Sequence, residues 1–270
     1  MFSMARRRAA QKSHRGIMSP MWQVAARFRI SMVVNLVLGL SAMSRAQSAA
    51  PTVTPQRPSF SNNTSTTFPG WLELESGVAV EEDGFDSPLL LKYGALGNAE
   101  IFLGVSPVVA ASGDAGVGNL NLGGRLRFLD AADGSPALAG LGSLTLPTST
   151  LEGTDDRVGF NFVLIASRAW RDWGVDLNLG TSFSGGFEDG QLFGIWTLSK
   201  SFGEKISGYA EGLVNRDFAS DRNSVVGGVG GAYMVSSGLV VDSALNFNIS
   251  NAAFDVQFLA GATVLLTQVR

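Results

Sequence analysis

The chain of 270 residues contains no cysteine, and its only histidine is His14. Without cysteine it can form no disulfide framework and has no thiolate nucleophile. If the first residues are removed, as argued next, the mature chain also lacks imidazole. Ser-His-Asp triads, Cys-His dyads and His-ligated zinc sites are then excluded. We therefore expect a protein that is not an enzyme, with no catalytic residues, no cofactor and no metal site.

Acidic residues are absent from the first 72 positions, where nine of the twenty basic residues lie. The apolar run Ile30–Met43 is shorter than the about 20 residues that a helix needs to cross a bilayer. Ser44-Arg45-Ala46 follows, with small residues where a signal peptidase cleaves. This order predicts a secretory signal peptide at residues 1–46, cleaved near Ala46 to Ala50. A mitochondrial transit peptide is the alternative, because the segment is rich in arginine and free of acidic residues.

Cleavage after Ala46 leaves 12 basic and 23 acidic residues, so the mature chain is acidic. A chain of that charge has no electrostatic attraction to nucleic acid, and we expect no nucleic-acid partner. Residues 47–70 are rich in proline, serine, threonine and asparagine, which predicts a polar periplasmic lead-in. The rest of the chain, residues 71–270, is expected to form one domain.

Strong helix-forming blocks are also missing after residue 50, and apolar and polar residues alternate instead. Val175, Leu177 and Leu179 alternate with Asp176 and Asn178, so a strand here has one apolar and one polar face. The same pattern, clearer in some segments than in others, gives twelve candidate strands: 71–80, 89–93, 100–106, 118–130, 137–146, 157–168, 175–183, 191–200, 206–215, 225–235, 239–250 and 254–266. The prediction is an all-β fold, an antiparallel transmembrane β-barrel of about twelve strands (ten to fourteen) over residues 71–270.

The connections favour lipid rather than water outside this barrel. Those after even-numbered strands look short, such as Arg171-Asp172, and those after odd-numbered strands are mostly longer and acidic, such as residues 147–156. Outer-membrane barrels alternate short periplasmic turns with longer external loops in this way. Aromatic residues near strand ends on the short-turn side resemble one interfacial girdle: Trp71, Tyr93, Trp170, Trp173 and Tyr233. The expected location is the outer membrane of a Gram-negative bacterium.

Three motifs resemble a bacterial family of outer-membrane transporters, the "MetA-pathway of phenol degradation" barrels. They are Leu74-Glu75-Ser76-Gly77, Lys92-Tyr93-Gly94 and Glu100-Ile101-Phe102-Leu103-Gly104, and the later GVGNLNLGGRLRF is similar to another strand of that family. The resemblance implies an outer-membrane barrel that passes small, often hydrophobic or aromatic, compounds. The chain departs from many such barrels by ending in Gln268-Val269-Arg270 rather than in the aromatic residue presented to the barrel assembly machinery.

If the apolar faces meet lipid, the charged residues of the strands line the lumen, because a charge facing the membrane core costs a few kcal/mol. The candidates are Glu73, Glu75, Lys92, Glu100, Arg125, Arg127, Arg157, Asp176, Glu211 and Asp242. They could set up a transverse field that orders polar solutes, or form an ion-pair network that fills the barrel. A glycosidase built on Glu73 and Glu75 is disfavoured, because nothing marks a sugar cleft.

The sequence thus predicts a passive outer-membrane channel for small molecules, with no chemical step. Two alternatives stay open: a non-conducting structural or ligand-binding barrel plugged by its own charges, and a secreted soluble β-barrel that binds a ligand. The expected partners are outer-membrane lipid and lipopolysaccharide, a small-molecule solute and the barrel assembly machinery.

Overall fold

The computed structural model describes residues 51–269 except 112–113, 153, 155 and 185–188; the predicted signal peptide lies outside the described residues. Fifteen strands occur in the described part: β1 (Trp71–Glu81), β2 (Gly84–Asp86), β3 (Leu89–Leu96), β4 (Ala99–Val105), β5 (Val109–Ala111), β6 (Asp114–Gly116), β7 (Leu120–Leu129), β8 (Ala137–Leu146), β9 (Gly159–Trp170), β10 (Trp173–Ser184), β11 (Gln191–Phe202), β12 (Ile206–Asp217), β13 (Arg222–Ser236), β14 (Leu239–Ser250) and β15 (Val256–Gln268). Among these residues no helix is long and apolar enough to cross a membrane.

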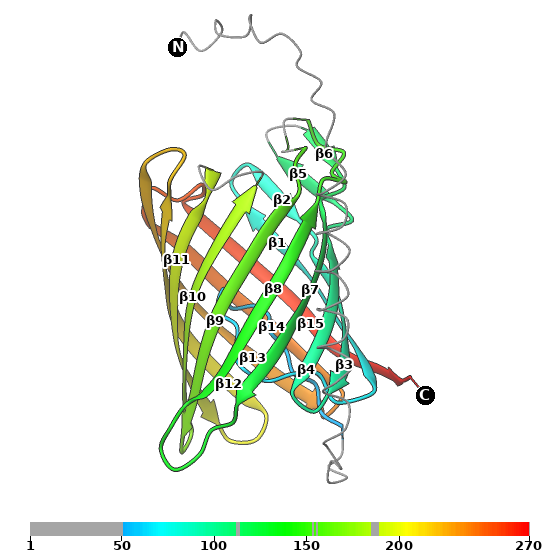
Figure 1. Cartoon of the computed structure of the whole chain (residues 1–270). Helices are drawn as coiled ribbons and strands as arrows, with labels where there is room; N and C mark the ends of the chain where they lie inside the picture. Colours follow the sequence, from blue (N-terminus) through cyan, green and yellow to red (C-terminus); the bar gives the residue numbers. More distant parts are fainter. Residues whose placement is uncertain (1–50, 112–113, 153, 155, 185–188, 270) are drawn as a thin grey trace, which may run out of the picture. The chain divides into compact units, whose positions relative to one another are not determined.

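Twelve of the strands form a closed antiparallel barrel (Figure 1). In the order β1, β3, β4 and β7 to β15, each strand pairs with the next. β15 pairs with β1 over eleven positions, from Trp71↔Gln268 to Glu81↔Gln257. Closure leaves the barrel itself without an exposed sheet edge, as a wall inside lipid requires. The predicted fold class and strand number are confirmed.

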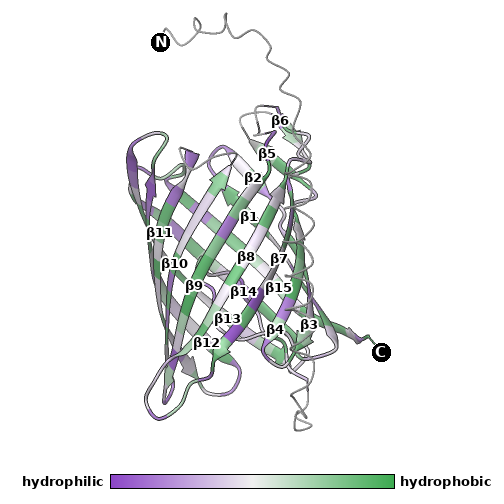
Figure 2. Cartoon of the chain, in the orientation of Figure 1, coloured by the Kyte–Doolittle hydropathy of each residue, from purple (hydrophilic) through white to green (hydrophobic). Residues whose placement is uncertain are grey.

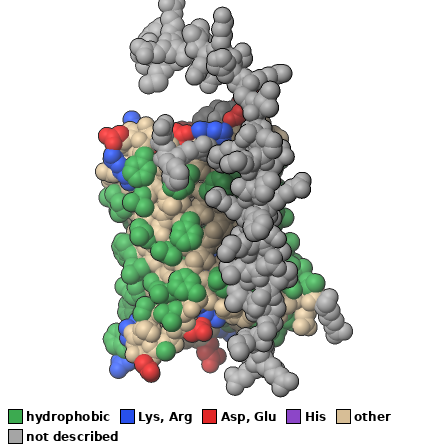
Figure 3. Space-filling view, in the orientation of Figure 1, with side chains coloured by type: hydrophobic (Ala, Val, Ile, Leu, Met, Phe, Trp, Pro, Cys, Tyr) green, Lys and Arg blue, Asp and Glu red, His purple; other side chains and the backbone are tan. Residues whose placement is uncertain are grey.

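The register places the predicted apolar face outside. Leu177 pairs with Trp196 and Ala166, and its side chain is 53% exposed, whereas that of the next residue, Asn178, is 5% exposed. Figure 2 shows hydrophobic and hydrophilic residues alternating along the strands. Hydrophobic side chains cover the middle of the visible outer face in Figure 3, and charged side chains gather at its two ends. A soluble protein rarely exposes so extended an apolar surface, so the soluble-barrel alternative is rejected.

The three short strands lie outside the barrel wall and were not predicted. β2 pairs with the last residues of β1, β5 pairs with β2, and β6 pairs with β5. These strands form a small sheet that extends from the end of β1 beyond the barrel wall (Figure 1). The loop between β12 and β13 is also shorter than predicted, because β12 runs on to Asp217 and β13 begins at Arg222. Loop length therefore separates the two barrel ends less sharply than the sequence indicated.

One side of the lumen is apolar, which the alternation did not indicate. Ala139 and Leu141 of β8 and Val163 and Ile165 of β9 are buried, and they pack together with the partly buried Phe102 and Phe193. Residues 160–166 of β9 are apolar on both faces except for Asn161, so the strand offers hydrophobic side chains to lipid and to lumen alike. The barrel interior thus has one continuous apolar wall, β8–β9, and elsewhere buried apolar residues such as Val226 and Val240 lie among buried polar ones.

Candidate functional site

The candidate site is the interior of the barrel at its short-turn half, where most of the predicted lumen charges meet. Seven of the ten predicted residues are buried: Glu73, Glu75, Lys92, Glu100, Arg125, Glu211 and Asp242. Arg127 and Asp176 are half-buried. These nine residues come from seven strands, β1, β3, β4, β7, β10, β12 and β14, because each strand places alternate residues on the inner face.

Arg157 differs from the other nine predicted residues. β9 begins at Gly159, so Arg157 lies in the preceding loop, and its half-exposed guanidinium donates to Oδ2 of Asp189 at 2.6 Å. The apolar residue at position 158 extends the alternating pattern, so the sequence predicts a strand that begins two residues before β9 does. Arg157 therefore belongs to the external loops and not to the buried cluster.

Lys92 joins two carboxylates across β3 and β1. Its Nζ lies 2.5 Å from Oε1 of both Glu73 and Glu75, and all three side chains are almost fully buried. The register explains this geometry, because Lys92 pairs directly with Glu73, and Glu75 is the next inward residue of β1. Nζ also donates to the main-chain oxygen of Thr54 at 2.8 Å, so the lysine holds a part of the chain that precedes the barrel.

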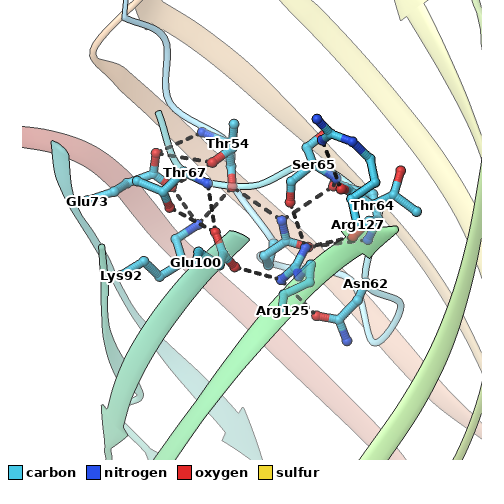
Figure 4. A network of polar contacts seen from close by, with 12 residues as sticks. Thr54, Asn62, Thr64, Ser65, Thr67, Glu73, Lys92, Glu100, Arg125 and Arg127 are labelled. Carbon is cyan, nitrogen blue, oxygen red and sulfur yellow. Dashed lines mark hydrogen bonds and ion pairs between the residues drawn. The ribbon is translucent and has the colours of Figure 1, made fainter. Parts of the chain in front are cut away.

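Thr54 belongs to a stretch that runs inside the barrel, here called the lumen segment, residues 53–69. It starts at the turn between β13 and β14, where the Val53 N–H donates to the Ser237 carbonyl, and it ends where Pro69 bridges to Gly94 of β3. Between these points it contacts inward residues of strands all around the barrel. The composition of residues 47–70 predicts a periplasmic lead-in with no part in the lumen, whereas in the structure residues 53–69 lie inside the barrel (Figure 4).

Wall carboxylates bind the lumen segment through its main chain. Oε2 of Glu73 accepts the N–H of Thr54 at 2.8 Å, and Glu75 accepts those of Gln56 and Arg57 at 3.0 and 3.1 Å. On the opposite side, Glu211 of β12 accepts the N–H of Phe60 at 3.0 Å and the hydroxyl of Ser59 at 2.5 Å. These hydrogen bonds satisfy both the buried carboxylates and the backbone of a segment that has no sheet partner.

The return half of the lumen segment is held by one acid, Glu100, and two bases, Arg125 and Arg127, and Nη1 of Arg127 donates to the Thr64 carbonyl at 3.3 Å (Figure 4). Glu100 accepts the Thr67 N–H at 2.7 Å and pairs with Nη2 of Arg125 at 3.1 Å. Nη1 of Arg125 donates to the main-chain oxygens of Asn63 and Ser65 at 2.6 and 2.9 Å. Glu100 thus accepts a hydrogen bond from a main-chain N–H group, and Arg125 donates to main-chain carbonyl groups of the same segment. The ion-pair network and the lumen segment are therefore joined by hydrogen bonds.

Neutral wall residues complete the attachment. Asn178 of β10 accepts the Asn62 N–H at 2.7 Å and donates to the Asn62 carbonyl at 2.8 Å, as a strand neighbour would. Ser167 of β9 accepts the Thr64 N–H at 2.9 Å and donates to Asp176 at 2.5 Å. Asp176, a predicted lumen residue, therefore acts on the segment through Ser167.

Arg57 of the lumen segment lies against two glycines of the wall. Gly77 of β1 and Gly261 of β15 pair in the register, and a Cβ on either would overlap the Arg57 guanidinium. Its Nη2 donates to the Ala260 carbonyl at 3.1 Å and lies 3.8 Å from Oδ1 of Asp242. Arg57 is the only basic residue between Arg45 and Lys92, and this isolation in a polar stretch was the one sequence signal that could have indicated its role.

A cavity of about 460 Å³ remains in the lumen beside the segment. Its polar lining includes Asn121, Arg125 and Asn161, and its apolar lining includes Phe102 and Leu141. The volume lies within the range of about 300–1,000 Å³ typical of small-molecule sites. Among the described residues no group of three or more acidic or histidine side chains could hold a metal ion. What the arrangement offers is a confined space of mixed polarity.

Comparisons with known proteins agree with this architecture. The family model described as "Putative MetA-pathway of phenol degradation" matches residues 55–266, and no curated protein matches the chain. The COG4313 outer membrane channel from Pseudomonas putida F1 is similar in structure, with a TM-score of 0.61 and 12% identity over 79% of this chain and all of that one. The KdgM porin in complex with disordered oligogalacturonate has a TM-score of 0.55 and 11% identity over 72% of this chain and 99% of that one. The NanC porin has a TM-score of 0.55 and 6% identity over 72% of this chain and all of that one. The fold is that of outer-membrane porins and channels.

Proposed function

The chain belongs to the family described as "Putative MetA-pathway of phenol degradation", and from this premise we propose that it is a passive outer-membrane channel for small molecules. The observation that carries the proposal is the lumen itself, a closed barrel whose interior keeps a cavity of about 460 Å³ beside the lumen segment. Solutes pass by diffusion, and no chemical step takes place. Outer-membrane lipid and lipopolysaccharide surround the barrel, and the barrel assembly machinery inserts it.

The lining of the cavity favours solutes that are partly apolar. Phe102 and Leu141 belong to or adjoin the apolar β8–β9 wall, whereas Asn121 and Asn161 offer amide groups at the side of the long loops. A small aromatic compound with one or two polar substituents matches such a surface better than a sugar chain, because only part of the lining can replace lost hydration. The family description, which refers to phenol degradation, agrees with this class of solute.

The lumen segment sets the size limit of the channel. Glu75, Glu211, Asn178 and Ser167 hold it from four strands, so the free cross-section is the part of the lumen that it leaves open. Weakening one attachment should enlarge that space without affecting the barrel wall. Asn178→Ala removes two hydrogen bonds to Asn62, worth about 1 kcal/mol each.

Solute flux into liposomes tests the proposal. The full chain is expressed, purified from outer membranes and reconstituted, and swelling is followed with neutral solutes of increasing size, small phenols among them. We expect flux of the smallest solutes and a larger size limit for Asn178→Ala. Asn246→Ala is the matched control, because this buried lumen amide bonds to Gln257 of the neighbouring strand. Flux unchanged from wild type is expected there.

The many hydrogen bonds of the lumen segment favour one other function, a non-conducting barrel with a structural or binding role. In that case a folded, inserted barrel shows no flux in either wild type or Asn178→Ala. Circular dichroism of the same liposomes establishes that the barrel is folded, so absence of flux is informative about function and not about insertion.

A further inference from the structure

A groove on the lipid-facing surface lies at the short-turn end of β8 to β11. It encloses about 580 Å³ and is lined by Trp170, Trp173, Val175, Leu198 and Arg168, with Pro136 at the turn before β8. The register puts these side chains on the outer face, because Arg168 pairs with Val175, and Trp173 pairs with Trp170. Leu198 also pairs with Val175 from the other side. The groove is therefore separate from the lumen.

Two cations gather around its tryptophans. Lys200 Nζ lies 4.9 Å from the ring centre of Trp173 and 5.4 Å from that of Phe202, and the Arg171 guanidinium lies 5.5 Å from the ring centre of Trp170. Lys200 pairs with Trp173, so its side chain emerges on the same outer face as the rings. Together with Arg168 this face carries three positive charges at one membrane interface.

These charges are not neutralised by ion pairs in the described part of the chain. Asp133, Asp172 and Glu204 lie in the three adjacent turns, but no carboxylate of the described residues lies within 4.0 Å of Arg168, Arg171 or Lys200. Phe202 and the two tryptophans mark the level of the headgroups, where amphipathic rings accumulate. Cations at that level, above an apolar groove, complement a lipid with an anionic headgroup.

We propose that this groove binds an anionic glycerophospholipid of the periplasmic leaflet, such as phosphatidylglycerol. Arg168 and Lys200 bind the phosphate from the two sides of the groove, and the tryptophans and Leu198 contact the acyl chains. The short turns next to the groove place it at the periplasmic side, where the leaflet consists of phospholipid. The proposal requires an inserted barrel but not a conducting one, so the result of the flux experiment neither supports nor contradicts it.

Tryptophan quenching by brominated lipid tests the site. In a Trp71→Phe/Trp196→Phe background, Trp170 and Trp173 are the only tryptophans after Trp22, which lies in the predicted signal peptide. The barrel is reconstituted in vesicles of phosphatidylcholine and phosphatidylglycerol of fixed composition. In one sample part of the phosphatidylglycerol is brominated, and in the other an equal amount of phosphatidylcholine is brominated. Each cation near a headgroup is expected to enrich the anionic lipid about fivefold at low ionic strength. Brominated phosphatidylglycerol should therefore quench several-fold more effectively.

Charge variants identify the residues responsible. Arg168→Gln and Lys200→Gln should each reduce the preference, and the double variant should remove it. Arg222→Gln removes one charge at the opposite end of the barrel, at the start of β13, and should leave the preference unchanged. Equal quenching by the two brominated lipids would overturn the proposal. An equal loss in Arg222→Gln would also overturn it, because attraction would then depend on overall charge alone.

Discussion

Replacing Lys92 by methionine removes the buried cation between β1 and β3 while keeping a side chain of similar length. Both carboxylates that it pairs with, those of Glu73 and Glu75, then stay buried without a counter-charge. Removing one partner of a buried ion pair costs about 3–5 kcal/mol of folding free energy, because the remaining charge stays desolvated. Glu73 keeps the Thr54 N–H and Glu75 keeps that of Gln56, so a loss of about 3 kcal/mol is expected.

Equilibrium unfolding in urea measures this loss. The barrel is reconstituted in lipid vesicles, tryptophan emission is followed over a urea series, and folding and unfolding curves are required to coincide. Lys205→Met is the matched control, since this exposed lysine lies in the turn between β11 and β12 and its removal should change stability by less than about 0.5 kcal/mol. The triple variant Glu73→Gln/Glu75→Gln/Lys92→Met removes all three charges and should recover most of the loss.

Equal unfolding midpoints for Lys92→Met and Lys205→Met would refute the reasoning, because the buried lysine would then contribute no more than an exposed one. A triple variant as unstable as Lys92→Met would refute a different part of it. In that case shape and hydrogen bonding, and not an unpaired buried charge, would account for the loss.

Three further predictions follow from single contacts. Leu177→Arg should lower the free energy of unfolding of the inserted barrel by about 2–4 kcal/mol, measured by urea unfolding, because residue 177 faces lipid. Asn178→Arg should still insert, but it should raise liposome swelling because the larger side chain displaces the lumen segment. Gly94→Ala should also raise swelling, because a Cβ there overlaps main-chain oxygens of the lumen segment. The Glu82 carboxylate accepts hydrogen bonds from its own N–H and from that of Val256, which hold its pKa below the usual range. The exchange protection of the Val256 amide should therefore be complete above the usual glutamate pKa and fall as pH drops through the lowered one, as NMR hydrogen exchange can show.

The barrel wall could be predicted because lipid imposes one rule on every strand. Leu177 and Asn178 differ so strongly in hydropathy that only one facing avoids a polar side chain in hydrocarbon, and most of the twelve segments obey the same rule, although the facing of residues 191–200 is ambiguous. Where both faces of a strand are apolar, the rule does not predict which residues point into the lumen. Val163 and Ile165 are as hydrophobic as their lipid-facing neighbours, and the apolar lumen wall was missed for that reason.

The lumen segment escaped prediction for a different physical reason. Apart from those of the Ser59 and Thr54 hydroxyls, its hydrogen bonds to Glu73, Glu75 and Glu211 use main-chain N–H groups, which every residue except proline has, so these bonds leave no mark on the segment's own sequence. A solvated linker has the same composition of serine, threonine, asparagine and proline. The wall residues carried the information instead, as buried carboxylates that outnumber the buried cations facing them.

That excess of carboxylates bears on the path of a solute in the proposed channel. Among the residues that the structure describes, the wall has five buried carboxylates but only two buried cations, Lys92 and Arg125. The polar walls therefore attract the lumen segment through its N–H groups and through Arg57. A solute that entered there would have to displace these hydrogen bonds. The β8–β9 wall contributes Leu141 and Asn161 to the cavity and forms fewer bonds to the segment. If the barrel conducts as proposed, the path of a solute therefore follows the less polar side of the lumen, where the cavity lies.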